Sequence, residues 1–177
     1  DGRVMLPKEA LAVCDAYGAW LKKHRQQLPT WFPVDHTTEE FKATYPFHPV
    51  VLSVFQRKWQ SLPRFQQTRG VLRLLALWVS KVFHESFKQN RGDLLLGLGD
   101  APLGDPNFRA AVFEQLGEQR LEAAVTTDIS GKKDAFAERL DKEALDTIQK
   151  SRLHTKVATA IFFESNGGQT KAEATQP

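Results

Sequence analysis

The stretch from Gln67 to Phe83, QTRGVLRLLALWVSKVF, constrains the fold of this chain more than any other. Apolar residues recur along it with helical spacing on two faces, so the pattern predicts a helix over 68–87 that is packed between two neighbours. One face carries Leu72, Leu75, Val79 and Phe83, and the other carries Val71, Leu74, Trp78 and Val82. Arg73 stands in the first turn, on the narrow polar line that remains. Burying a guanidinium without a partner costs several kcal/mol, so we expect an anionic group to face Arg73.

The rest of the chain is also patterned as helix, with no internal repeat. Helices are expected over 8–27, over 37–43 within an otherwise irregular 28–45, from Pro49 to Pro63, over 105–117, over 118–125, and over 134–163 with a break near Asp141. A turn is expected at 128–131. The sequence therefore predicts an all-α fold: a helical bundle over 1–90, a second, smaller helical part over 91–165, and a polar flexible tail over 166–177.

Composition excludes several classes of protein. Cys14 is the only cysteine among the 177 residues, which excludes an intrachain disulfide framework and a thiolate zinc site; we expect Cys14 to be a small core residue. The five histidines lack metal-ligand spacing, so no metal site is expected. No apolar run reaches the roughly 20 residues of a membrane span and no signal peptide is apparent, so a cytoplasmic protein without membrane contact is expected. The chain begins at Asp1, which suggests a fragment of a longer protein.

Charge is distributed unevenly along the chain. No Asp or Glu occurs over 41–84, a stretch with seven Lys and Arg residues, whereas 93–147 holds twelve acids against six bases. Aromatic residues interleave the basic stretch, so it belongs to a packed unit, and it indicates a nearby anion: a phosphate, a nucleic-acid backbone or an acidic partner surface. A solvated face is the alternative. The candidates for binding nucleic acid or a partner are Lys42, Arg57, Lys58 and Arg64.

Catalytic motifs are absent from this sequence. It contains no G-x-x-x-x-G-K-[ST] loop, and GGQTK near the end has the right residue types in the wrong order. The Gly-rich segment 97–104 follows no predicted strand and is interpreted as a connector. His48, beside Pro49, is expected to make a hydrogen bond at the start of a helix. The chain alone is not predicted to be an enzyme, and no catalytic residue is assigned.

Three motifs carry a resemblance to a known family. They are YPFHP at 45–49, LPRFQQTRG at 62–70 and LRLLA at 72–76. Together they resemble the large prokaryotic AAA+-like P-loop ATPases grouped as "domain of unknown function 499". The likeness continues weakly through DAPLGDPNFR and TTDISG and more firmly through KVATAIFFESNGG, so it covers most of the chain from Tyr45 onward.

The resemblance implies a role for Arg73. In AAA+ proteins a helical lid packs over the nucleotide, and a G-x-x-R at the start of a lid helix contacts the terminal phosphates. Gly70 and Arg73 match that pattern, and Arg69 is a second candidate. The resemblance also implies ATP and Mg²⁺ in the parent protein, a P-loop core of that protein as partner, possible oligomerisation of the parent, and a prokaryotic defence or DNA-processing setting.

Other interpretations stay open from the sequence. Arg73 could instead pair with a carboxylate from 93–147. The chain as a whole could be a helical nucleic-acid-binding module that uses the basic residues above together with Arg69, or a plain protein-interaction domain.

Overall fold

The structure, a computed structural model, describes residues 5–28, 36–62, 65, 67–89, 95–131 and 133–166. These residues form nine α-helices and no strand, apart from an isolated bridge between Phe47 and Leu96. The predicted all-α fold class is confirmed. The helices are α1 Lys8–Lys23, α2 Thr37–Thr44, α3 Pro49–Arg57, α4 Gln67–Gln89, α5 Pro106–Leu116, α6 Arg120–Ala124, α7 Phe136–Glu143, α8 Asp146–Ser151 and α9 Leu153–Ser165.

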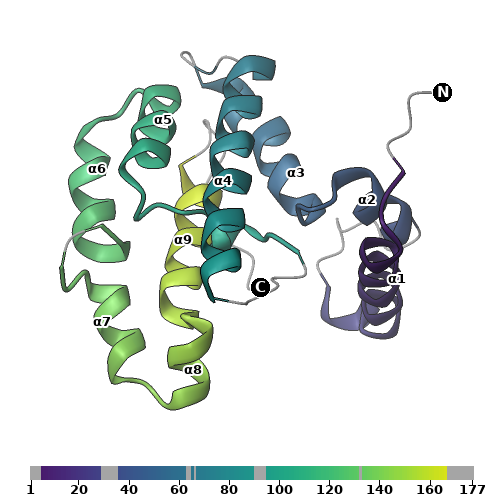
Figure 1. The fold of residues 1–177 in the computed structure, drawn as a ribbon. Coiled ribbons are helices and arrows are strands. Elements are labelled where there is room, and N and C mark those ends of the chain that lie inside the picture. Colours follow the sequence, from purple (N-terminus) through teal and green to yellow (C-terminus); the bar gives the residue numbers. More distant parts are fainter. Residues whose placement is uncertain are drawn as a thin grey trace.

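The long helix α4 lies near the middle of the molecule (Figure 1). Helices α5 to α9 gather on one side of it, while α1 and α2 form a hairpin at the opposite end, beyond α3. The π-helix Val125–Ile129 continues α6 toward the turn before α7. The chain therefore crosses from the hairpin through α3 and α4 into the larger helical part.

Aromatic residues form the main core, and Phe163 of α9 lies at its centre. Its ring centroid is 5.5 Å from that of Trp59, 6.3 Å from Phe55 and 6.4 Å from Trp78. Trp59, Trp78 and Phe163 are all fully buried, as expected for the two tryptophans from the sequence. This core joins residues from both sides of the predicted domain boundary at residue 90, and that boundary stays a prediction.

A second, smaller core holds the α1–α2 hairpin together. Its buried members are Cys14 and Leu21 of α1, Phe41 of α2, and Leu95. Cys14 is fully buried, as the sequence predicts. The ring of Tyr17 packs against Phe41 at a centroid distance of 5.7 Å. The hairpin thus has apolar contacts of its own, separate from the main core.

The ends of α5 follow the residues that the sequence marks. The Asp105 carboxylate accepts hydrogen bonds from the backbone N–H groups of Asn107 and Phe108, both at 3.0 Å, which satisfies donors that a helix start leaves free. Gly117 ends the helix with φ of 74°, a left-handed conformation that glycine adopts without a steric cost. Local chemistry sets both boundaries.

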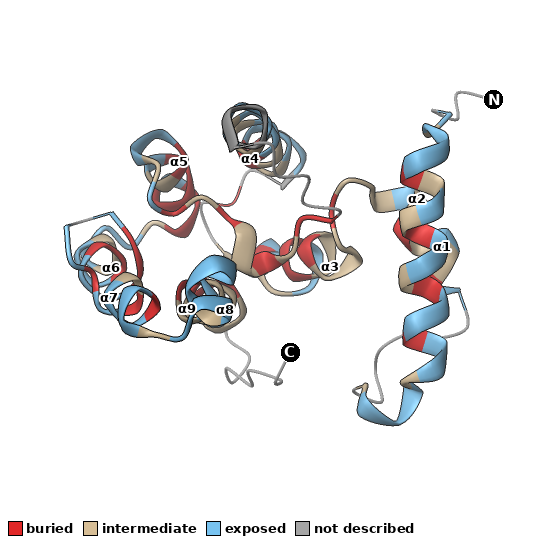
Figure 2. Cartoon of the chain, turned by 60° about the horizontal axis from the view of Figure 1, so that its bottom comes forward, coloured by how far each residue is buried: buried red, intermediate tan, exposed pale blue. Residues whose placement is uncertain are grey.

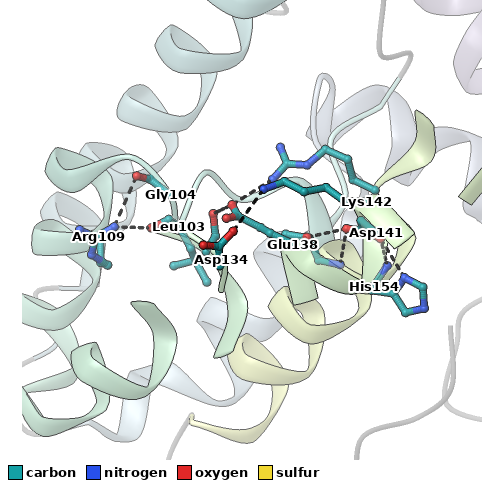
Figure 3. A network of polar contacts seen from close by, with 11 residues as sticks. Leu103, Gly104, Arg109, Asp134, Glu138, Asp141, Lys142 and His154 are labelled. Atoms are coloured by element: carbon teal, nitrogen blue, oxygen red, sulfur yellow. Dashed lines mark hydrogen bonds and ion pairs between the residues drawn. The ribbon is translucent and has the colours of Figure 1, made fainter. Parts of the chain in front are cut away.

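The helical stretch over 134–163 is broken at two places, and neither is Asp141. The interruptions fall at 144–145 and at Arg152, where φ is 53°. The first interruption begins three residues after Asp141, so a break does occur near the predicted residue. Asp141 itself lies inside α7 and is buried. Its carboxylate instead caps the first turn of α9 (Figure 3).

Asp141 accepts four hydrogen bonds from that turn. They come from the backbone N–H groups of His154 and Thr155 at 2.8 and 3.0 Å, from the Thr155 hydroxyl at 2.6 Å, and from His154 Nδ1 at 2.9 Å when that nitrogen carries the proton. Burial raises the pKa of Asp141, but the hydrogen bonds from Thr155 and His154 outweigh it and hold the pKa below its usual range. The ionised carboxylate therefore ties α7 to α9.

His48 caps α3, as expected from its place before Pro49. Its Nδ1 accepts a hydrogen bond from the backbone N–H of Val50 at 3.2 Å, and its ring packs edge-on against Phe41 at 5.2 Å. Burial lowers the pKa of His48 to about 4, because the imidazolium form loses its water. The neutral ring is the form that fits this position.

Acid is therefore expected to destabilise the fold through His48. Between the ordinary pKa of 6.5 and the folded value of about 4, the unfolded chain binds a proton that the folded chain does not, so the free energy of unfolding falls as pH drops through this window. The two values set a limit of roughly 3 kcal/mol on the loss. Urea unfolding measured across the window tests this. His48→Asn keeps a capping acceptor and should show a shallower pH dependence; an unchanged slope in that variant would contradict the assignment.

Candidate functional site

Helix α4 has one buried face and one exposed face. Leu74 and Trp78 are fully buried. On the opposite side Leu72, Val79 and Phe83 are 61%, 37% and 65% exposed, with Ala76 exposed between them. The prediction that α4 is packed between two neighbours is therefore wrong for this side within the described residues. We call Leu72, Ala76, Val79 and Phe83 the α4 stripe; Figure 2 shows the mixed burial along this helix.

Arg73 lies on the flank of the α4 stripe and is not buried. Its side chain is 54% exposed, and Nη1 donates to Glu114 Oε2 of α5 at 2.5 Å. Glu114 is equally exposed and belongs to the acidic stretch 93–147. The anionic group that faces Arg73 is thus a carboxylate, the alternative that the sequence left open. A pair this exposed contributes about 0–1 kcal/mol to stability, far less than a buried one.

Gly70 has a packing role at the start of α4. It is buried, and a Cβ placed on it would lie 2.3 Å from Oε1 of the buried Gln115. The glycine therefore lets α4 approach α5 closely. This differs from the implied role of Gly70, which was an approach of the backbone to phosphate.

Arg69 and His84 extend the same flank as Arg73. Both side chains are exposed, and the four-residue spacing of Arg69 and Arg73 places them on one side of the helix. The first acidic residue of α4 is Glu85. The α4 stripe is therefore flanked by arginines along its first turns.

Two of the other predicted binding residues are engaged by carboxylates. Lys42 Nζ lies 3.1 Å from Asp15 Oδ1 and 3.6 Å from Glu39 Oε1. Lys58 donates to both the carboxylate and the backbone carbonyl of Glu164 on α9. These contacts hold the two lysines to α1, α2 and α9.

Of the remaining two predicted residues, the structure describes one. Arg57 Nε donates to Ser53 Oγ at 2.6 Å within α3, and Arg64 lies outside the described residues. Within the part of the chain that the structure describes, the predicted basic residues are not brought together into one patch.

A polar cleft of about 1070 Å³ lies beside the Gly-rich segment 97–104, bounded by α4, α8 and α9. Its charged residues carry both signs, and several of them are paired, as in Lys156 Nζ with Asp100 Oδ1 at 2.7 Å and Lys81 Nζ with Asp105 Oδ2 at 3.4 Å. Ser130 Oγ donates to Glu138 Oε1 at 2.5 Å. Paired charges of both signs do not favour an anionic ligand here.

Two of the three glycines in this segment are explained by close packing. A Cβ on Gly99 would lie 2.6 Å from the carbonyl oxygen of Lys156, and one on Gly104 would lie 2.7 Å from Ser130 Oγ. Arg109 Nη1 donates to the Leu103 carbonyl at 2.8 Å and holds the loop from the other side (Figure 3). These contacts account for both glycines without a phosphate.

Two further properties bear on the class of site. Among the described residues, no three His, Cys, Asp or Glu side chains lie together in a way that could hold a metal ion. No helix in those parts of the chain combines the length and the apolar character that crossing a membrane requires.

The fold and the site define an all-α helical protein with an exposed apolar helix face beside two arginines. Comparison of the chain with family models, with curated proteins and with solved structures gives no match. The function is therefore argued from the α4 surface itself.

Proposed function

We propose that this chain is the lid-type, nucleotide-sensing and coupling region of a larger AAA+-like ATPase, and that the α4 stripe packs on the P-loop core of that protein. The exposure of Leu72, Val79 and Phe83 beside Arg69 and Arg73 is the observation that carries the proposal. Half-exposed aliphatic and aromatic residues at helical spacing are typical of a surface that another protein part covers. The sequence resemblance suggests that the covering part is the P-loop core of the same protein. We propose that this parent protein is cytoplasmic.

Arg73 has the chemistry that a nucleotide sensor needs. Its guanidinium is exposed and can leave Glu114 at a cost of about 1 kcal/mol or less. A planar fork of donors then matches phosphate oxygens in a bidentate arrangement. In this proposal ATP and Mg²⁺ are held by the core, and the bound nucleotide supplies the negative charge that draws Arg73 from Glu114.

Loss of the γ-phosphate returns Arg73 to Glu114 in this mechanism. The two alternative partners of one side chain form a two-state element whose balance depends on the nucleotide. Because Gly70 packs α4 tightly against α5, a movement at the start of α4 is passed to α5 and the helices beyond it. The lid thereby couples hydrolysis to a change in shape.

The nucleic-acid alternative has less support. Lys42 and Lys58 are engaged by carboxylates, which reduces the net positive charge that they present. Binding to a phosphate backbone would weaken steeply with salt, so a titration of the chain with duplex DNA at two ionic strengths distinguishes this alternative.

Two tests of the proposal use the full-length protein. The first is its sequence: the reading frame that encodes this chain should also encode a G-x-x-x-x-G-K-[ST] loop. The second is a variant of the α4 stripe. Phe83→Glu should lower ATP turnover about tenfold or more, because a carboxylate in an apolar contact costs at least 1.4 kcal/mol. The matched control is Leu145→Glu, at an 80% exposed position between α7 and α8, which should keep full turnover. A full-length protein without a P-loop, or equal turnover of both variants, refutes the proposal.

A further inference from the structure

A second apolar surface lies between α7 and α9, away from α4. It is a groove of about 400 Å³ with an almost entirely apolar lining. Phe136 and Leu140 of α7 are 51% and 48% exposed there, and Leu153 and Ile161 of α9 are 46% and 47% exposed. Four large apolar side chains, each about half exposed in one groove, are unusual on a surface that only meets water.

The geometry of the groove is that of two neighbouring helices with an open side. Figure 1 shows α7 running down one arm of a hairpin, with α8 and α9 returning along the other arm. Phe136 and Leu140 are four residues apart, as are Leu153, Val157 and Ile161, so each helix presents a continuous apolar line. Two such antiparallel helices are half of a four-helix arrangement, which two more helices can complete.

The rim of the groove carries both signs of charge. The Arg139 guanidinium lies over the Phe136 ring, 5.0 Å from its centroid, and Glu143 is exposed one turn further along α7. Asp128 lines the groove itself. Along α4 itself the flank of the α4 stripe carries arginines and no acid before Glu85, but Glu114 of α5 pairs with Arg73 there.

The charges at the rim of the groove favour a contact between two copies of the chain. A two-fold dimer sets a surface patch against the same patch of its copy. A rim with one sign of charge would then repel itself, whereas Arg139 of each copy can face Glu143 of the other if the two α7 helices meet antiparallel. The mixed rim therefore fits a second copy of this chain.

We propose that the α7–α9 groove is the contact surface of a symmetric dimer of this chain, in which α7 and α9 of both copies form a four-helix interface. This dimer is independent of the ATPase proposal, because it uses neither the α4 stripe nor Arg73. Either proposal can fail while the other stands.

Sedimentation equilibrium of the 177-residue chain, from low micromolar to submillimolar concentration, tests the dimer. The expected result is a reversible monomer–dimer equilibrium in which the dimer has twice the monomer mass of 20.0 kDa. Leu140→Glu and, on the other helix, Ile161→Glu should each weaken dimerisation about tenfold or more, because each places a charge in the apolar contact. Leu72→Glu is the matched control on α4 and should leave the dissociation constant unchanged. Circular dichroism establishes that each variant is folded.

Exchanging the charges of Arg139 and Glu143 tests whether the rim contributes to the dimer contact. Arg139→Glu and Glu143→Arg should each weaken the dimer, and the double variant should restore it, since the two charges face one another across the two-fold axis. Three results would overturn the proposal: a chain that is monomeric over the whole range, a dimer that Leu72→Glu dissolves while Leu140→Glu does not, or a double variant that stays as weak as the single ones.

Discussion

Phe163→Ala is expected to lower the free energy of unfolding by about 3–5 kcal/mol, the usual cost of truncating a buried aromatic residue. Phe163 is fully buried, and its ring packs against Phe55, Trp59 and Trp78. It therefore joins α9 to α3, α4 and the turn after α3, and its removal leaves a cavity that these helices cannot close. Urea unfolding followed by circular dichroism measures the loss.

Phe83→Ala is the matched control for this variant. Phe83 is 65% exposed on the α4 stripe, so the same truncation leaves no cavity and should cost less than about 1 kcal/mol. Equal losses in the two variants would show that the aromatic cluster around Phe163 does not hold the fold together.

Arg73→Ala should lower ATP turnover of the full-length protein by about 10²-fold, if Arg73 stabilises phosphate charge in the transition state. Stability should change by less than about 1 kcal/mol, because the Arg73–Glu114 pair is half exposed. Arg73→Lys should restore only part of the turnover, since an ammonium group cannot reproduce the bidentate geometry. Turnover and thermal unfolding are measured on the same samples.

Glu114→Gln separates the two roles of Arg73. If Arg73 serves only as the partner of Glu114, both variants should have the same small effect on stability and neither should affect turnover. If Arg73 senses nucleotide, Glu114→Gln removes the competing partner and turnover should be maintained or raised. Unchanged turnover in Arg73→Ala would make the ion pair its whole role.

Local signals in the sequence predicted the helices well. The start of α5 at Asp105-Pro106 and its end at Gly117 depend on a cap and a left-handed residue, which act within a few positions. The burial of Trp59 and Trp78 followed from helical periodicity in the same way. Each of these features is decided by residues near one another in the chain.

Features that depend on distant residues could not be predicted. The second face of α4 has an apolar pattern whether or not a neighbour covers it, so its exposure could not be read from the periodicity of Leu72, Val79 and Phe83. Glu114 was one of twelve carboxylates over 93–147, and only the packing of α4 on α5 selects it for Arg73. The cap that Asp141 places on α9 likewise joins residues 13 and 14 positions apart.

The separation of the apolar contacts into two cores has a consequence for how the chain opens. The α1–α2 hairpin is held by Cys14, Leu21, Phe41 and Leu95, and none of these belongs to the aromatic cluster around Phe163. A unit with few buried contacts of its own opens at a lower free energy than the rest of a protein. Backbone amides of α1 and α2 should therefore exchange with solvent deuterium through a partial opening that leaves α3, α4 and α9 folded, so the hairpin is a cooperative unit that can be lost and regained without global unfolding.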